Sequence, residues 1–526
     1  MVKRLINFLT RNQNRILLLF VALLFLCLTV PTFLSDNHFL YNLEPYPDGL
    51  YYTLSAKNFI EQGRLSLEYN SIKVVISQPP LYSALLTIGY FLWNNPASFY
   101  SINVLLLLTS IIIITKIVID SKITTFIKVV SILFLISHAY FYWIVSLPMT
   151  ENLTILLFCL LLYFVTRTEF TKKVFYSTVI TAILLILTRI ATIPTAITCI
   201  AIGFYRLSKS IDKKTKRNYF IIGILGLILL NYAFLFFIGK SMLDYFLFFF
   251  SETFITKNES LFYNIGNLKR NILAYAQIVT GSSANFLWLT HPITSIGMFL
   301  SILLNFIYNK NRQKVGKIIF PLLLVFISLF SLLLTFYLSD SRYIIYIIPI
   351  YILLFSVTAP TKTTITYKIL LLILLIAHIY SQLPLFKNIL SENILHRSKA
   401  WQYEATKIIE QFAADNTNPK LISALPPHLI DAYTDNTMTL LPLSNSQEFM
   451  QKKQYVWGNE IEYSNLQTYY INEVQNGAEI YITNSYITQQ QSVIADYEKF
   501  KDNFEFVLIQ EGCLNSCNIY KLNPKE

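Results

Sequence analysis

The chain has 526 residues, of which 54% are hydrophobic and only 14% are charged. Because soluble domains carry roughly 25% charged residues, this composition excludes an ordinary soluble protein and predicts a polytopic membrane protein with a soluble remainder. The net charge of +12 lies in short Lys and Arg clusters between apolar runs. This is the positive-inside pattern of membrane proteins, and it gives no indication of a nucleic-acid partner.

The first apolar run, residues 16–33, is long enough to cross a bilayer, which takes about 20 residues. It follows Lys3, Arg4, Arg11 and Arg15, and no small-residue cleavage site comes after it. We therefore expect it to remain as the first transmembrane helix, with the N-terminus on the cytoplasmic side.

A polar segment over residues 35–98 forms the first outer loop. Within it, Asp48 is a favoured N-cap for a short amphipathic helix over residues 49–62, and Gly63 can end that helix in the left-handed conformation. Asp48 either caps this helix and does nothing more, or presents a carboxylate at the membrane surface for chemistry. Residues 80–93 are short for a crossing and start at a proline, so they predict an interfacial helix.

The later apolar runs alternate in direction, because the Lys and Arg clusters between them fall on the inner side. This pattern predicts about eleven spans, with the N-terminus inside and the C-terminus outside. The runs after the first are residues 104–119, 129–147, 154–165, 174–187, 193–205, 220–238, 286–308, 318–338, 344–357 and 369–385, with residues 243–250 as a further interfacial segment.

From about Lys387 the composition becomes that of a soluble domain. The predicted fold class is therefore an all-α polytopic membrane domain over residues 1–386, followed by a small extracytoplasmic α/β domain over residues 387–526. The expected helices are residues 400–412 and 492–500, and the expected strands are residues 420–425, 439–443, 478–483, 504–510 and 517–522.

Five cysteines fall into two groups. Cys27, Cys159 and Cys199 lie in apolar runs and are expected to act as small hydrophobic residues. Cys513 and Cys517 lie between the last two predicted strands in an external compartment, so a disulfide is favoured over free thiols. No metal site is predicted, because neither these cysteines nor the six histidines show the spacing of a ligand set.

Polar and charged residues from distant parts of the sequence are predicted to lie at the outer ends of spans or in outer loops. Each one alone is more simply an interfacial anchor or half of an ion pair, but two acids and two arginines together suit a site that binds a phosphate leaving group and deprotonates a hydroxyl. The set is Asp48, Lys73, Gln78, Glu151, Arg189, His291, Asp340 and Arg342.

Four short motifs occur in the order found in one family of membrane enzymes. Over residues 16–385 the chain resembles GT-C fold glycosyltransferases, the group of protein mannosyltransferases and lipid A aminoarabinose transferases. The matching motifs are Asp48-Gly49-Leu50-Tyr51-Tyr52 with Ala56-Lys57-Asn58 and Pro79-Pro80-Leu81-Tyr82, then Pro148-Met149-Thr150-Glu151-Asn152, Leu187-Thr188-Arg189, and Ser341-Arg342-Tyr343 followed by Pro349.

Three positions depart from the family pattern. Gly49 stands where a second acid usually follows the Asp, with Glu44 as a candidate substitute. Gln78 stands where a basic residue often precedes Pro-Pro-Leu, which leaves Arg64 and Lys73 as candidates for holding the donor phosphate. Glu151 stands where an Asp is more common.

The resemblance implies transfer of a hexosyl or pentosyl group from a polyprenyl-phosphate carrier to a lipid, glycan or protein acceptor at the outer face of the bacterial cytoplasmic membrane, with inversion. In that picture Asp48 is the base and Glu151 the second catalytic acid, while Arg189 and Arg342, with Lys73, stabilise the departing lipid phosphate. Tyr52, Gln78, Asp340 and Tyr343 complete the substrate site. No cofactor is firmly implied, although a divalent metal such as Mg or Mn is compatible with the group.

Three alternatives remain at this point. A transporter or flippase of a lipid-linked saccharide would also have many spans with few charges, although paired broken helices and midplane polar residues are not evident and His138 and His378 look like isolated structural residues. An oligosaccharide ligase or polymerase would share the lipid carrier. A catalytically dead scaffold would have little reason to keep Asp48.

Overall fold

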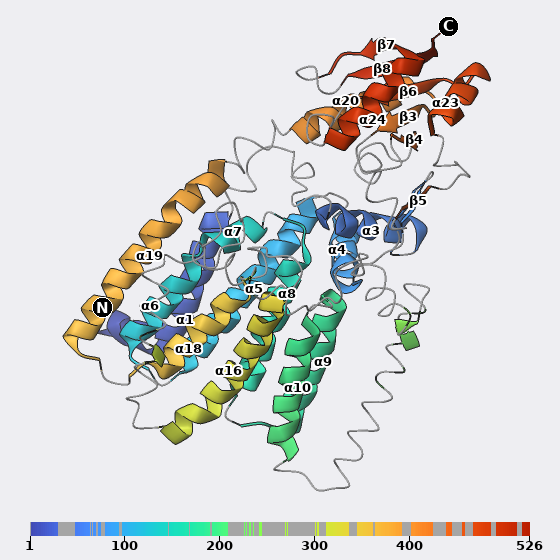
Figure 1. Cartoon of the computed structure of the whole chain (residues 1–526). Helices are drawn as coiled ribbons and strands as arrows, with labels where there is room; N and C mark the ends of the chain where they lie inside the picture. The colour runs from blue at the N-terminus through green and yellow to red at the C-terminus, as the bar shows by residue number, and fades with distance from the viewer. Residues whose placement is uncertain are drawn as a thin grey trace.

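The computed structural model consists of a helical body and a small α/β domain next to one end of it (Figure 1). It describes residues 2–29, 48–63, 65, 67–69, 72–74, 79–93, 97–208 without 122, 146, 168, 190 and 191, 312–335, 345–391 without 361 and 362, 401–423, 438–443, 455–457, 466–484, 491–512 and 518–525, with scattered single residues between 226 and 303. The end of the body nearest the α/β domain is called the outer end below.

The helices of the body follow the predicted apolar runs, and most extend beyond them by several residues. Their inward sides share one continuous core of buried apolar side chains that runs from Val21 to Leu375. The helices are α1 (Val2–Thr29), α3 (Asp48–Gln62), α4 (Leu81–Leu92), α5 (Ala97–Asp120), α6 (Thr125–Ile136), α7 (Ala139–Val145), α8 (Thr150–Val165), α9 (Lys172–Thr188), α10 (Ile193–Ser208), α16 (Arg312–Thr335), α18 (Ile347–Thr358) and α19 (Ile365–Ser391).

Two helices in the described part of the chain are long and apolar enough to cross a membrane, Ser98–Asp120 and Ile365–Pro384. The helices α6 and α7 form a bent pair, and the described part of the chain has up to three such spans if this pair counts as one. The predicted runs at residues 220–238, 243–250 and 286–308 lie almost entirely outside the described residues. The total of eleven spans therefore remains a prediction.

The third predicted span, residues 129–147, is not one continuous helix. It is divided into α6 and α7, which meet at an angle of 44°. The break falls at Ser137 and His138, and the Gln382 side chain of α19 accepts a hydrogen bond of 3.0 Å from the backbone of Ala139 just after it. Polar groups from a neighbouring helix thus replace hydrogen bonds that the break removes.

The interpretation of His138 and His378 as isolated residues is wrong. Their ring centroids lie 4.6 Å apart, and both side chains are buried. The pair joins the break between α6 and α7 to the middle of α19, a contact that sequence separation concealed.

The predicted helix in the first outer loop is confirmed as α3, which begins at Asp48, one residue earlier than expected. It ends at Gly63, where φ is +73°, the left-handed region in which glycine has no steric penalty. The Gly63 amide donates to the carbonyl of Phe59. After it the chain forms a short antiparallel hairpin, β1 (Leu67–Tyr69) and β2 (Ile72–Val74), and then α4, the predicted interfacial helix.

The C-terminal domain has the predicted α/β class. Its sheet has the strand order β4-β3-β6-β8-β7, in which β4, β3 and β6 are parallel and β8 and β7 complete an antiparallel end. The strands are β3 (Lys420–Ser423), β4 (Thr439–Pro442), β6 (Ile480–Thr483), β7 (Phe504–Gln510) and β8 (Ile519–Pro524), and the helices are α20 (Trp401–Asp415), α23 (Leu466–Gln475) and α24 (Gln491–Asn503). Of these, α23 was not predicted.

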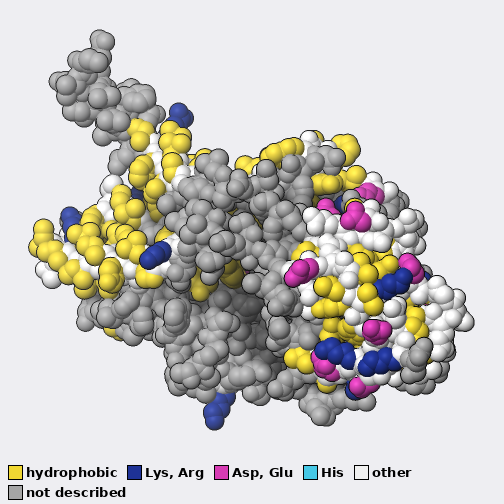
Figure 2. All heavy atoms as spheres, turned by 90° about the horizontal axis from the view of Figure 1, so that it is seen from above, with side chains coloured by type: hydrophobic (Ala, Val, Ile, Leu, Met, Phe, Trp, Pro, Cys, Tyr) yellow, Lys and Arg dark blue, Asp and Glu magenta, His cyan; other side chains and the backbone are white. Residues whose placement is uncertain are grey.

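The surface also separates the two parts of the molecule. Figure 2 shows acidic and basic side chains interspersed over the C-terminal domain at the right, whereas hydrophobic side chains cover the helices at the left. In α19 the exposed side chains include Ile369, Ile373, Ile376 and Leu383. An apolar exposed face on a long helix is what contact with lipid requires.

A short strand joins the two parts. β5 (Tyr455–Trp457), from the chain that follows β4, pairs antiparallel with β2 of the first outer loop, so that the sheet order is β1-β2-β5. In this register Lys73 lies opposite Val456 on one side and opposite Glu68 on the other. The C-terminal part of the chain is thus hydrogen-bonded to the loop that follows α3.

Candidate active site

Glu151 lies in the first turn of α8 at the outer end of the body. The N-cap residue, Met149, has extended backbone and offers no side-chain cap, so an acidic residue in the first turn complements the positive end of the helix dipole. Glu151 is only 1% exposed, and the Thr150 hydroxyl lies 3.4 Å from its Oε2. A carboxylate this deeply buried requires a charged partner.

That partner is Arg189, the C-cap residue of α9. Its Nη1 lies 2.5 Å from Glu151 Oε1, and the Arg189 side chain is 16% exposed. The same Nη1 is 3.3 Å from the hydroxyl of Tyr346, the N-cap residue of α18. One guanidinium therefore joins three segments that are far apart in the sequence.

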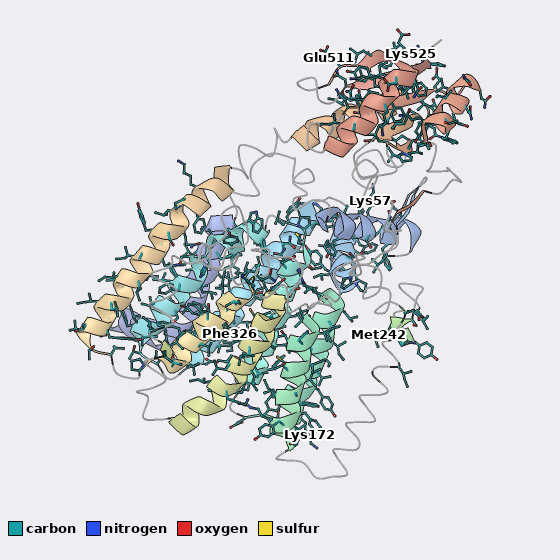
Figure 3. All side chains as sticks on the ribbon, in the orientation of Figure 1. Lys57, Lys172, Met242, Phe326, Glu511 and Lys525 are labelled. Carbon is teal, nitrogen blue, oxygen red and sulfur yellow. The ribbon has the colours of Figure 1, made fainter. Side chains whose placement is uncertain are left out.

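Arg189 reaches this position because α9 ends there. The backbone of Arg189 is extended, its amide still donates to the carbonyl of Leu185, and its own carbonyl accepts from Thr192. Figure 3 shows that Lys172, at the start of α9, lies at the opposite end of the body from Lys57 of α3. The other end of α9, with Arg189, consequently lies on the side of α3, as the alternation of spans predicted.

A pair of tyrosines, Tyr82 and Tyr52, lies on the side of the site where Tyr82 is close to the Glu151 carboxylate. Tyr82 of α4 is fully buried, and its ring meets that of Tyr52 of α3 edge to face at 5.4 Å between centroids. The Glu151 carboxylate lies close enough to the Tyr82 phenol for its charge to act on it. The Tyr82 hydroxyl donates to Asn103 Oδ1 of α5 at 2.7 Å.

Asp48 is the first residue of α3, and Tyr52 follows it by four residues. Because one helical turn rises about 5.4 Å, the Asp48 backbone lies roughly one turn from Tyr52, on the same side of the helix. The structure therefore brings together three of the predicted site residues, Tyr52, Glu151 and Arg189, and places the start of α3 next to them.

Other predicted residues are not tested. The backbone of Lys73 is in β2, but its side chain lies outside the described part of the structure. The remaining predicted residues, Gln78, His291, Asp340, Arg342, Tyr343, Cys513 and Cys517, lie outside the described residues altogether.

No group of three or more His, Cys, Asp and Glu side chains that could hold a metal ion occurs in the described ranges. Glu151, the buried acid among them, is already bonded to Arg189. The divalent metal that the resemblance allows therefore finds no complete ligand set within these ranges.

Tyr346 and Asn103 are site residues that the sequence reasoning missed. Tyr346 comes three residues after Tyr343 of the Arg-Tyr motif, so its closeness to that motif was a signal that could have identified it. Asn103 is a single polar residue at the start of an apolar run, which is a weak signal in a sequence but a costly group in an apolar interior unless it is hydrogen-bonded.

Comparison with known proteins gives the fold and no closer relationship. No protein-family model matches the chain, and no curated protein matches it. Among solved structures, ArnT from Cupriavidus metallidurans bound to undecaprenyl phosphate is similar over 97% of this chain and 98% of its own, with a TM-score of 0.63 and 12% identity. The apo state of the same protein is similar over 98% of each chain, also with a TM-score of 0.63.

The chain has the GT-C fold. A more distant GT-C neighbour is the archaeal oligosaccharyltransferase AglB from Archaeoglobus fulgidus, in complex with an inhibitory peptide and a dolichol-phosphate. It is similar over 98% of this chain and 75% of its own, with a TM-score of 0.51 and 12% identity. The expectation of a GT-C body followed by a small domain with a sheet is confirmed at the level of the fold.

Proposed function

We propose that this protein is a membrane glycosyltransferase that moves a sugar from a polyprenyl-phosphate carrier to the hydroxyl of a lipid, glycan or protein acceptor, at the outer face of the bacterial cytoplasmic membrane. The observation that carries the proposal is the buried pair of Glu151 and Arg189 next to the start of α3, inside a GT-C fold. Two structural neighbours hold undecaprenyl phosphate and a dolichol-phosphate respectively, which supports a polyprenyl-phosphate donor here.

In the proposed reaction Asp48 accepts the proton of the acceptor group as the acceptor atom bonds to the anomeric carbon. The bond from that carbon to the phosphate oxygen breaks, its electron pair leaves with the polyprenyl phosphate, and the configuration inverts. General-base assistance of this kind contributes about 100- to 10,000-fold to a rate.

Arg189 has the chemistry to stabilise the leaving phosphate. A guanidinium carries five N–H donors in a fixed fork, and the contacts with Glu151 and Tyr346 both involve Nη1. Glu151 holds the guanidinium in place, and the Arg189 side chain remains 16% exposed, which is where a phosphate oxygen would approach it. We assign Arg342 and Lys73 to the same phosphate, and Tyr52, Gln78, Asp340 and Tyr343 to the remainder of the substrate site.

The lipid part of the donor would approach along α4. The end of this helix away from Tyr82 exposes a group of apolar side chains, Ile88, Phe91, Leu92 and Trp93. Apolar and aromatic residues of this kind favour the membrane interface. One helix would thus connect the lipid surface to the buried polar site.

The test is release of free polyprenyl phosphate by purified protein in nanodiscs, from a panel of polyprenyl-phosphate sugars, with wild type beside Asp48→Asn. We expect release by wild type from at least one donor and none by Asp48→Asn in a folded, inserted protein. The matched control is Asp120→Asn, the same change in an exposed acid at the C-terminal end of α5. This variant should keep wild-type activity.

Two results would overturn the proposal. An active Asp48→Asn variant would remove Asp48 from the chemistry. If wild type bound the carrier lipid tightly but released it from no donor, and the Asp48→Asn change left that binding unaltered, a transporter of lipid-linked saccharides or a binding scaffold would be the better account.

A further inference from the structure

The connection between α7 and α8 determines where Glu151 lies, and it contains a dense set of buried hydrogen bonds. Leu147, Pro148 and Met149 make a tight turn in which the Met149 amide donates to the Leu147 carbonyl at 2.8 Å and the Leu147 amide donates to the Ile144 carbonyl at 3.0 Å. Glu151 follows two residues later. Any movement of this turn would move the carboxylate with it.

Asn152 connects the turn to the helices on both sides. It is fully buried, and its Nδ2 lies 2.9 Å from the Leu147 carbonyl and 3.2 Å from the carbonyls of Ile144 and Met149. A single amide thus ties the first turn of α8 to the last turn of α7. Asn152 is also the direct neighbour of Glu151.

Asn103 holds the same turn from a different helix. This fully buried residue of α5 donates from Nδ2 to the Leu147 carbonyl at 2.7 Å and to the Val145 carbonyl at 3.3 Å. Its Oδ1 accepts from the Tyr82 hydroxyl of α4. The two carbonyls assign the amide orientation, because a carbonyl oxygen can only accept and therefore requires the nitrogen, which leaves the Asn103 oxygen to accept from the Tyr82 hydroxyl.

Side chains from two helices, Asn103 of α5 and Asn152 of α8, therefore donate to the Leu147 carbonyl, and Tyr82 of α4 is hydrogen-bonded to Asn103. Several buried hydrogen bonds on one short turn make the local structure rigid, because each of them weakens when the geometry changes, although Asn152 Oδ1 itself is buried without a hydrogen-bond partner. A rigid turn before Glu151 is what an ion pair of fixed geometry with Arg189 needs, because the N-cap residue of α8 contributes no side-chain hydrogen bond to hold the first turn.

We propose that Tyr82, Asn103 and Asn152 are positioning residues that set the place of Glu151, and through it the orientation of Arg189. The inference rests on the proposed function, in which Arg189 faces the donor phosphate. It assigns to α4 a second task beyond contact with lipid, because its Tyr82 is hydrogen-bonded to Asn103 of the network.

The test is a double-mutant cycle between Asn103→Leu and Glu151→Gln, read out in two independent ways: binding of undecaprenyl phosphate and release of it from a sugar donor. Asn103→Leu keeps the volume but removes the amide. Tyr82→Phe, which deletes one hydroxyl, is the milder second variant in case Asn103→Leu does not fold. Ser356→Ala is the matched control, because it removes a buried hydrogen bond of 3.0 Å to Ser131 between α18 and α6.

We expect Asn103→Leu to lower turnover by about 10- to 100-fold, as a displacement of about 1 Å in a site can. Asn103→Leu should change undecaprenyl phosphate binding in the same direction as Glu151→Gln, and the two changes in affinity should agree within about twofold. The double variant should lose no more affinity or turnover than the more affected single variant, because the effects of residues that act as a unit are not additive. Tyr82→Phe should show a smaller loss in the same direction, and Ser356→Ala should change neither readout.

A purely structural role gives a different pattern. In that case Asn103→Leu would lower the fraction of folded protein, and its fold-loss of turnover would multiply with that of Glu151→Gln in the double variant. Ser356→Ala would then cause losses similar to those of Asn103→Leu. This result would overturn the inference. Unchanged binding and turnover in Asn103→Leu would also overturn it. If wild type binds undecaprenyl phosphate but releases none from any donor, the proposed enzyme function fails, and the binding cycle alone decides the positioning role.

Discussion

The Glu151 carboxylate and the Arg189 guanidinium lie 2.5 Å apart, although 38 residues separate them in the chain. Glu151 is almost completely buried and Arg189 largely so. Replacing one member of such a pair leaves the other charge buried without compensation, which costs about 3–5 kcal/mol in a fully buried pair.

Glu151→Gln is therefore expected to lower the rate of polyprenyl phosphate release by about 100- to 1,000-fold, the range seen when one preorganised electrostatic group is removed from an active site. The Arg189→Lys variant should also lose activity, because a lysine keeps the charge but lacks the planar fork of the guanidinium. Release kinetics in nanodiscs, together with thermal unfolding, measure both effects.

The control for this change is Glu61→Gln. Glu61 makes a 3.9 Å pair with Lys57 on the exposed side of α3. Exposed pairs contribute about 0–1 kcal/mol, so this variant should match wild type in rate and stability. Equal losses in Glu61→Gln and Glu151→Gln would mean that any acid near the outer end matters, and that the buried pair has no special role.

The pairing of β2 with β5 predicts a specific cross-link. A chain with Lys73→Cys and Val456→Cys should form an intramolecular disulfide under mild oxidation, because these residues are opposite one another in the register. Cleavage between the two parts of the chain, followed by electrophoresis without reductant, detects the link as two fragments that stay together.

Lys73→Cys with Val507→Cys is the matched pair that should not cross-link, since β7 is the far edge strand of the five-stranded sheet and its Val507 is exposed. Efficient oxidation of this second pair, or failure of the first, would show that β5 is not held beside β2.

Gly63→Ala is expected to destabilise the end of α3 by about 1–2 kcal/mol. The cause is backbone conformation alone, because φ is +73° and a Cβ at this position would meet no atom within 4 Å. The measurement is the shift of the thermal unfolding midpoint in detergent.

Gly226→Ala is its control, because this helical glycine also has open space at the Cβ position but no positive φ. It should be neutral or slightly stabilising, by roughly 0.5–1 kcal/mol. A Gly63→Ala variant as stable as Gly226→Ala would contradict a left-handed residue at the end of α3.

Tyr470→Phe should destabilise the C-terminal domain by about 1–3 kcal/mol. The Tyr470 hydroxyl, which is fully buried, donates to the Pro442 carbonyl at 2.7 Å at the end of β4, and the variant leaves that carbonyl without this donor. Susceptibility of the domain to limited proteolysis measures the change. Tyr520→Phe, at a partly buried tyrosine in the same domain, should have the smaller effect, and the reverse order would argue against the Tyr470 bond.

Much of the fold could be predicted because it depends on local composition. Apolar runs and the basic clusters between them indicated where most of the described helices lie, and Gly63 and the alternating pattern after Lys387 indicated the end of α3 and the α/β class. The break between α6 and α7 was missed, because an apolar run looks alike whether it is one helix or two. The helix α23 was also missed, since its apolar spacing is weak and its burial comes from the sheet beneath it.

The sequence by itself determined a membrane body with a C-terminal α/β part, and it predicted that Asp48, Glu151 and Arg189 lie on the same side of the membrane, because charge and hydropathy are properties of single residues and short windows. Only the tertiary structure decided that Glu151 pairs with Arg189, that Tyr346 joins them, that Asn103 and Asn152 share the Leu147 carbonyl, and that β5 extends the hairpin of the first outer loop. These contacts join residues from different helices and strands, and hydrogen-bond partners over such distances are selected by the packing of the whole chain.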